Sequence, residues 1–124
     1  MGEITEKRSA AGWHFLIKAE NGQVIATSES YSSAAACRKG MESVLRCAPT
    51  APIWDQTDPA APAPANPRFE VFQDKAGHYR FRLRSRNSRI IAASEGYETR
   101  SACLGGIASL RRNVHGQTDE ISGE

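Results

Sequence analysis

Several features on which enzymes and membrane proteins depend are missing from this chain of 124 residues. No stretch approaches the roughly 18 apolar residues that a membrane-spanning helix needs. The first residues lack the apolar segment of a secretory signal, so we expect a cytoplasmic protein. A phosphate-cradling glycine loop, a G-x-S-x-G motif and an H-E-x-x-H motif are all absent. These absences predict a protein that is not an enzyme and that has no contact with a membrane.

Cysteine and histidine are scarce, with three of each, and no C-x-x-C pair occurs. Zinc sites and disulfide frameworks need other numbers and spacings, so we expect no metal and no other cofactor. Cys37 and Cys103 fall on the apolar faces of two expected helices. We expect both to be buried as small apolar side chains, with redox or catalytic use as the alternative.

The chain does contain an internal repeat, because residues 13–48 match residues 79–114 without a gap, 66 residues later. Twelve of the 36 aligned positions are identical, and they are spread through the block. The identical pairs are Phe15/Phe81, Asn21/Asn87, Ile25/Ile91, Ala26/Ala92, Ser28/Ser94, Glu29/Glu95, Tyr31/Tyr97, Ala36/Ala102, Cys37/Cys103, Gly40/Gly106, Ser43/Ser109 and Arg46/Arg112. Such a repeat indicates two copies of one supersecondary unit, and the short chain predicts that they share one core.

Each copy is expected to form three strands and a helix. In the second copy, residues 69–73 and 79–84 alternate apolar and polar side chains, which is typical of half-buried antiparallel strands. Residues 89–94 resume as a third strand. After residue 99 the apolar side chains take the spacing of an amphipathic helix.

The two expected helices share a cap and an internal glycine. Ser33 and Thr99 are candidate N-caps, because their side-chain oxygens can accept from free amides of the first turn. Gly40 and Gly106 lie mid-helix on the buried face, where glycine costs about 1 kcal/mol relative to alanine. Their presence in both copies indicates a close approach of each helix to the sheet or to the other helix.

The front of the first copy and the segment between the copies depart from this plan. The 66-residue offset puts residues 3–7 opposite residues 69–73, yet only Ile4 is strongly apolar there, so a strand over residues 2–8 is left open. Residues 49–68 contain all six prolines and are expected to form an extended linker. Within it, we expect Ile53 and Trp54 to dock on the domain, over what the weak first strand leaves open; binding a partner is the alternative.

The repeated motifs resemble those of the YegP-like family of small bacterial proteins. The resemblance rests on Ser28-Glu29-x-Tyr31 with Gly40-Met41-x-Ser43-Val44, and again on Ser94-Glu95-x-Tyr97 with Gly106-Ile107-Ala108-Ser109-Leu110. It implies an α+β fold of two tandem β-β-β-α repeats with pseudo-twofold symmetry, in which an antiparallel sheet packs against two helices. It implies no established activity and no catalytic residues. One departure is Ser88, which stands where the first copy has the turn glycine Gly22.

The expected organisation is therefore one domain made of two repeats. The first repeat covers residues 1–48, the linker 49–68 and the second repeat 69–115. Residues 69–115 carry 9 basic and 4 acidic side chains, so the second repeat is the basic half. Residues 116–124 form an acidic tail that is expected to be mobile.

The Ser-Glu-x-Tyr corners are the first candidate site. The residues are Ser28, Glu29, Tyr31, Ser94, Glu95 and Tyr97. Each corner lies where a strand gives way to a helix, so a structural role is expected, with Ser and Glu binding free backbone amides and Tyr packing its ring. Contact with a small-molecule ligand is the alternative.

An arginine row is the second candidate site. It consists of Arg80, Arg82, Arg84, Arg86 and Arg89. On one face of a strand, alternate side chains stand about 7 Å apart, close to the spacing of successive phosphates, so the row could bind a nucleic acid or another polyanion. No aromatic side chain is expected on that face, because Tyr79 and Phe81 point the other way. A solvated face paired with Glu70 or with the acidic tail is the structural alternative.

Together these observations predict a non-enzymatic binding or interaction module that is a monomer or a weak homodimer. The first expectation for its partner is another protein. Nucleic acid or another polyanion on the arginine row, and a small molecule at the Ser-Glu-x-Tyr corners, are the alternatives.

Overall fold

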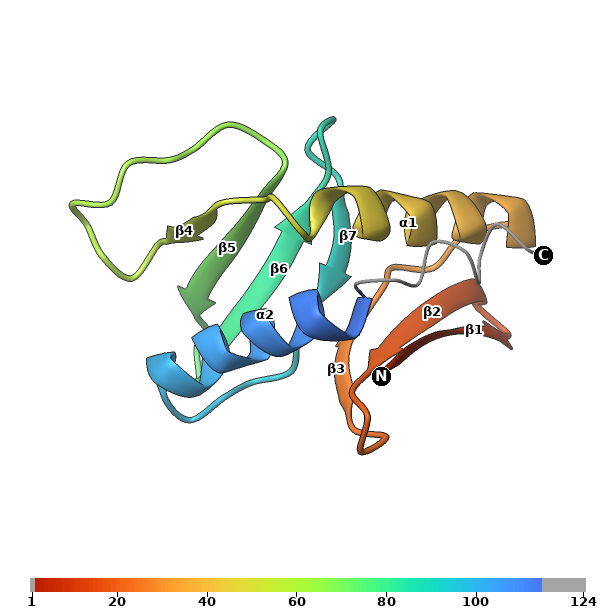
Figure 1. Cartoon of the computed structure of the whole chain (residues 1–124), viewed down its shortest axis with the longest axis horizontal. Coiled ribbons are helices and arrows are strands. Elements are labelled where there is room, and N and C mark those ends of the chain that lie inside the picture. Colours follow the sequence, from red (N-terminus) through yellow and green to blue (C-terminus); the bar gives the residue numbers. More distant parts are fainter. Residues whose placement is uncertain (1, 115–124) are drawn as a thin grey trace.

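The computed structural model describes residues 2–114, which Figure 1 shows in colour. The elements in chain order are β1 (Glu3–Ser9), β2 (Gly12–Lys18), β3 (Val24–Thr27), α1 (Ala34–Cys47), β4 (Ile53–Asp55), β5 (Arg68–Gln73), β6 (Tyr79–Arg84), β7 (Ile90–Ala93) and α2 (Arg100–Val114). Each repeat contributes three strands and a helix, and the linker adds β4. Neither helix within this part of the chain is long and apolar enough to cross a membrane. The acidic tail expected at 116–124 lies outside the described residues.

The strands form one sheet in the order β1-β2-β3-β7-β6-β5-β4. The two repeats meet at its centre, where β3 and β7 run antiparallel and Thr27 pairs with Ala93. These two residues are 66 positions apart, so they occupy the same place in their repeats. Equivalent residues paired in an antiparallel ladder put the pseudo-twofold axis between them. The predicted α+β fold of two β-β-β-α repeats is thereby confirmed.

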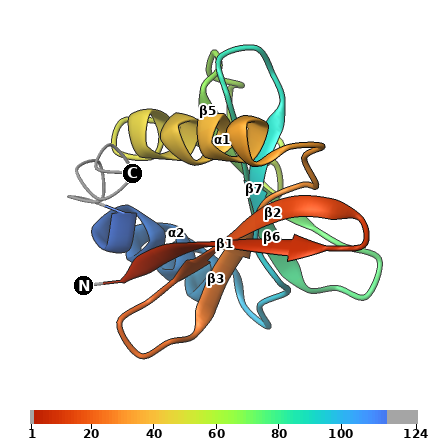
Figure 2. The same cartoon turned by 90° about the vertical axis from the view of Figure 1, so that its right-hand side faces the viewer.

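Both helices cover the same side of the sheet, as Figure 1 shows face-on and Figure 2 shows from the β1 edge. Helix α1 packs on β2 of its own repeat and on β7 of the other, while α2 packs on β6 and on β3. The side chains enclosed between the layers include Phe15, Ile17, Phe81 and Leu83, all fully buried. Because each helix crosses the repeat boundary, neither repeat has a core of its own.

Each helix starts where the cap residues predict. The Ser33 hydroxyl accepts a hydrogen bond from the Ala36 backbone N–H at 3.1 Å, and the Thr99 hydroxyl accepts one from Ala102 at 3.0 Å. Each bond satisfies a first-turn amide that has no partner within its helix.

Strand β1 is regular, and its register explains why its sequence pattern looked weak. Ile4 pairs with Ile17, whereas Phe69 pairs with Leu83, the repeat equivalent of Ile17. Ile4 is therefore the counterpart of Phe69, at an offset of 65 rather than 66.

The alignment of residues 3–7 with residues 69–73 was thus wrong by one position, because the first hairpin is one residue shorter than the second. The shift places Glu6, not an apolar residue, where Val71 stands in the second repeat. Glu6 lies 3.9 Å from Arg38 of α1, so a loose ion pair replaces a core contact there.

The linker contributes β4, which pairs in parallel with β5 at the sheet edge. Both residues therefore join the sheet, but only the Trp54 side chain packs on the domain, because the Ile53 side chain stays 39% exposed. The predicted position was wrong, since β4 and β1 lie at opposite edges of the sheet. Docking at the β5 edge is stabilised by an ion pair between Asp55 and Arg100 of α2. This short, Pro-flanked strand covers an edge that would otherwise expose unpaired backbone groups.

The turn between β6 and β7 holds a serine in the left-handed conformation. Ser88 has φ 74°, and its equivalent Gly22 has φ 81°. Because an L residue is strained there, we expect Ser88→Gly to raise the free energy of unfolding by about 0.5–1 kcal/mol. Urea denaturation would measure it. The reciprocal Gly22→Ser, whose new Cβ meets nothing within 4 Å, should lower stability by a similar amount, and shifts of the same sign in both variants would contradict this account.

Candidate functional site

The serines of the two Ser-Glu-x-Tyr corners complete the sheet. The Ser28 hydroxyl accepts from the backbone N–H of Phe15 at 2.9 Å and donates to the carbonyl of Glu29 at 2.7 Å. Ser94 makes the same two bonds in the second repeat, at 2.9 and 2.8 Å. Both hydroxyl protons are therefore committed to the backbone and are not available for chemistry.

The tyrosines of the corners pack on the helix glycines. A Cβ added to Gly40 would overlap the Tyr31 hydroxyl and lie 2.7 Å from its Cζ, and Gly106 stands in the same relation to Tyr97. The predicted close approach is therefore made by a tyrosine ring from the sheet side. Burial is the main cause that raises the pKa of both phenols, so they are neutral at physiological pH.

The glutamates of the corners do not behave as the motif predicts, since neither bonds a backbone amide within residues 2–114. Glu29 instead accepts from Arg89 of the second repeat at 2.7 Å. The equivalent of Arg89 in the first repeat is Gln23, so Glu95 lacks the matching ion pair. The two corners share their fold but not their electrostatics.

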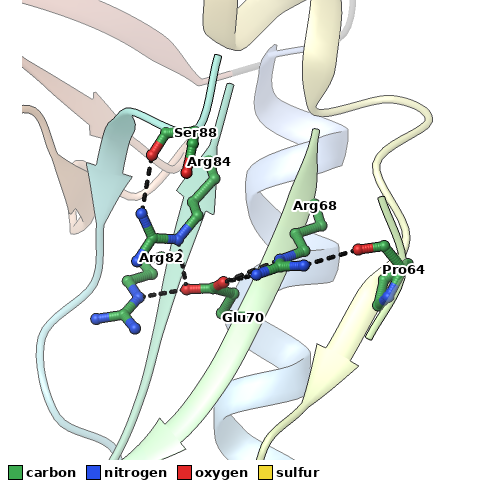
Figure 3. A network of polar contacts seen from close by, with 6 residues as sticks. All are labelled: Pro64, Arg68, Glu70, Arg82, Arg84 and Ser88. Atoms are coloured by element: carbon green, nitrogen blue, oxygen red, sulfur yellow. Dashed lines mark hydrogen bonds and ion pairs between the residues drawn. The ribbon is translucent and has the colours of Figure 1, made fainter. Parts of the chain in front are cut away.

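Arginines of β5 and β6 converge on one buried carboxylate, shown in Figure 3. Glu70 is 1% exposed. Its Oε1 accepts from Nε of Arg82 at 2.6 Å and of Arg84 at 2.9 Å, and its Oε2 accepts from Nε of Arg68 at 2.9 Å. Cross-strand pairing sets this geometry, because Glu70 stands opposite Arg82 and Arg68 opposite Arg84. We call these four residues the arginine cluster, and the helix-free side of the sheet that carries them the outer face.

The arginine cluster holds three positive charges against one negative charge, a net +2. Arg68 also donates to the Pro64 carbonyl and Arg84 to the Ser88 carbonyl, each at 2.8 Å. The terminal nitrogens of Arg82 make no hydrogen bond to the described part of the chain, and its side chain is 27% exposed. Arg82 therefore presents N–H donors toward solvent.

The cluster is fixed in its charged state. Burial alone would raise the pKa of Glu70, but hydrogen bonds from Arg82, Arg84 and Arg68 outweigh it and lower the pKa below the usual 4.5. The carboxylate is consequently ionised at neutral pH and orients the guanidinium groups that surround it.

Aromatic rings share the outer face with the cluster, so the prediction that none would lie there was wrong. Phe72 of β5 lies under Arg82, whose Cζ is 4.6 Å from the ring centroid, and Trp54 of β4 lies under Arg68 at 4.5 Å. The prediction considered β6 alone, whereas these rings come from the neighbouring strands. The stacked rings further restrict the guanidinium groups.

The predicted arginine row does not form one continuous surface. Arg80 pairs with Asp74 at 2.6 Å, and Arg89 pairs with Glu29 at 2.7 Å. Arg86 lies in the turn beyond β6. The strand ends at Arg84, so the alternation that would have kept the row on one face ends there too.

Two grooves lie between a helix of one repeat and a turn of the other. The α1 groove, between α1 and the β6–β7 turn, comprises adjoining hollows of about 480 and 620 Å³. The α2 groove, between α2 and the β2–β3 turn, is about 930 Å³. Residues shared by both α1 hollows are Ser43, Arg46, Ser85 and Asn87; the α2 groove is lined at the equivalent positions by Ser109, Arg112, Ala19 and Asn21. The α1 groove also reaches Tyr31, so one corner borders a hollow.

The three cysteines are free and buried. Burial raises the pKa of Cys37 and of Cys103 to about 11, so both remain thiols at neutral pH. Their matching, fully buried surroundings agree with the predicted packing role. Among residues 2–114, no three His, Cys, Asp or Glu side chains gather in a way that could hold a metal ion.

Comparison with known proteins reproduces the duplication. A family model described as a domain of unknown function (DUF1508) matches residues 9–55 and again residues 74–120. The chain belongs to the DUF1508 family. The resemblance to YegP-like proteins is confirmed, because the UPF0339 protein YegP of Escherichia coli O157:H7 is 33% identical over 112 residues, covering 90% of this chain and 88% of that protein.

A solved relative has the same architecture, and other relatives match one segment of the chain. The solution NMR structure of the E. coli protein of unknown function YegP superimposes with a TM-score of 0.74 at 31% identity, covering 91% of this chain and 85% of that one. A UPF0339 protein of Methanosarcina acetivorans is 52% identical over 47 residues, which are 38% of this chain and 81% of that protein, so a segment the size of one repeat makes up most of that relative. In a Stutzerimonas stutzeri relative, 51% identity over 46 residues spans 41% of its length.

Proposed function

We propose that this DUF1508 protein is a non-catalytic binding module that takes a nucleic acid or a similar polyanion on the outer face of its second repeat. The supporting observation is the arginine cluster, in which one buried carboxylate orients three guanidinium groups and leaves a net charge of +2. A preoriented guanidinium loses little conformational entropy on binding, which favours phosphate contacts.

The spacing along β6 suits a chain of phosphates. Arg82 and Arg84 stand on the same face of the strand, about 7 Å apart. In the first repeat the equivalent positions hold Leu16 and Lys18, so the first repeat presents less positive charge there. We therefore expect the polyanion to lie over the second repeat and to bind through phosphates rather than bases, since the Phe72 and Trp54 rings are covered by arginines.

The test is the salt dependence of binding to a labelled single-stranded oligonucleotide, followed by fluorescence anisotropy. Binding should weaken steeply with salt, and Arg82→Gln should reduce the slope of log K against log salt by about 0.7, the value for one lost phosphate contact. Glu70 keeps two arginine partners in this variant, and a thermal melt would verify folding.

The matched control is Lys18→Gln, the outer-face position equivalent to Arg84 in the first repeat, which should leave the slope unchanged. No binding at low salt, or equal effects of the Arg82 and Lys18 substitutions, would refute the proposal.

A further inference from the structure

Outside the Ser-Glu-x-Tyr corners, three identical polar pairs of the repeat lie at the surface. Asn21/Asn87 and Arg46/Arg112 are exposed, and Ser43/Ser109 are partly exposed. The two copies differ at 24 of the 36 aligned positions, so identity at the surface is not a general property of the repeat. In the fold these three pairs meet in the α1 and α2 grooves, with Asn from one repeat and Ser and Arg from the other.

Local turn structure does not account for the repeated asparagine. Asn21 accepts a hydrogen bond from the backbone N–H of Gln23 at 3.0 Å. Asn87 instead accepts one from the hydroxyl of Ser85. The side chains therefore make different local bonds, and what they share is the position at the mouth of a groove.

The α1 groove concentrates positive charge. Lys39, Arg46 and Arg86 line it, and none of the three forms an ion pair with residues 2–114, while Glu42 is the single carboxylate found among its described lining residues. The Cys47 thiol lines the same hollow as the two arginines. Burial raises its pKa, and the charges of Arg46 and Arg86 act against that rise.

The α2 groove differs at one charged position. Arg86 of the β6–β7 turn corresponds to Glu20 of the β2–β3 turn, and Glu20 lines the α2 groove together with Arg112. A carboxylate thus stands in the α2 groove where the α1 groove has a second cation. Arg111, also in the α2 groove, donates to the Ala48 carbonyl at 3.0 Å and is already engaged.

We propose that the α1 groove binds a small molecule by its phosphate or carboxylate group, held between Arg46 of the first repeat and Arg86 of the second, with Ser43 and Asn87 as hydrogen-bonding partners. The α2 groove does not bind it, because Glu20 replaces the second arginine. The hollows are of the size that small-ligand sites have, and an anion between two guanidinium groups makes charge-assisted hydrogen bonds to both. This site is separate from the arginine cluster on the outer face.

Titration of the full ¹⁵N-labelled chain at constant ionic strength tests the proposal, with inorganic phosphate in one series and acetate in another. Saturable shifts are expected for amides of residues 43–47 and 85–87, and not for the equivalent residues 109–113 and 19–21. The two series show which anionic group the groove prefers, and saturation with either one supports the site.

A reciprocal pair of variants makes the test specific. Arg86→Glu gives the α1 groove the residue of the α2 groove and should weaken binding at least about tenfold, or about 1.4 kcal/mol. Glu20→Arg should create saturable shifts in the α2 groove. Both positions are exposed, and Lys75→Gln, an exposed change in the β5–β6 turn outside both proposed sites, serves as the unaffected control.

The proposal fails if neither anion gives saturable shifts, if both grooves respond equally in the unaltered protein, or if Arg86→Glu binds as the unaltered protein does. Because none of these readouts uses an oligonucleotide, their failure is independent of the outer-face test.

Discussion

Gly106→Ala should lower the free energy of unfolding by about 2 kcal/mol, although alanine is the better helix former. The new Cβ would overlap the hydroxyl of Tyr97, lie 2.7 Å from its Cζ and lie 3.1 Å from Cε2 of Phe81. Overpacking of this kind costs about 1–3 kcal/mol. The atoms that the new Cβ would contact belong to aromatic rings packed in the core, which cannot easily move away. The gain of about 1 kcal/mol in helix propensity is too small to offset it.

The adjacent residue provides the control. A Cβ at Gly105 meets nothing within 4 Å, so Gly105→Ala should raise stability by up to about 1 kcal/mol. Chemical denaturation of the two variants should therefore give opposite signs. Adding Tyr97→Phe to Gly106→Ala removes the overlapping hydroxyl and should recover part of the loss. A stabilising effect at both glycines would show that the tyrosine does not limit the helix approach.

Glu70→Gln should lower the free energy of unfolding by about 3 kcal/mol at neutral pH. The substitution leaves the guanidinium groups of Arg68, Arg82 and Arg84 around a neutral amide, and removing one partner from a buried ion pair costs about 3–5 kcal/mol. We expect the lower end of that range, because the arginines are 19–27% exposed and can turn partly to water.

Lowering the pH should reduce the difference in free energy of unfolding between Glu70→Gln and the unaltered protein. The arginines hold the pKa of Glu70 below its usual 4.5, so its contribution to stability is fully present above that pH and is lost as pH falls through the lower, folded-state value. Denaturation curves recorded from neutral pH downward measure this. The control is Glu3→Gln, which removes an exposed carboxylate from the outer face at β1. It should change the free energy of unfolding by less than about 0.5 kcal/mol. A difference that stays constant into acid would mean that the carboxylate charge is not what stabilises the cluster.

Contacts that depend on a residue and its near neighbours could be predicted from the sequence. The helix caps Ser33 and Thr99 and the buried Cys37 and Cys103 were predicted correctly, since capping and periodic burial are local properties. The corner serines were also predicted as structural, although their amide partners are in β2 and β6 rather than in the helices.

Contacts between strands could not be predicted from the sequence where they depend on loop length or on which strand lies alongside. The one-residue difference between the two hairpins moved β1 relative to the repeat offset, and an ungapped comparison could not detect it. The aromatic rings on the outer face and the sharing of Glu70 among three arginines depend on which strands lie beside β6, a property of sheet order. The alternation along β6 and the pairing of its arginines with Glu70 were predicted from the sequence, but the third partner, Arg68, was not.

The sequence alone determined that the chain is a duplicated unit and where its two helices begin. It also determined that Gly40 and Gly106 lie where each helix closely approaches a neighbour. The tertiary structure decided how the units combine. Each helix packs on a strand of the other repeat, so the α1 groove joins residues about 40 positions apart, such as Arg46 and Arg86, and the α2 groove joins residues about 90 positions apart, such as Asn21 and Arg112. No local pattern connects such residues. The physical reason is that periodicity records which side of an element is buried, while the partner on that side is chosen by the packing of the whole core.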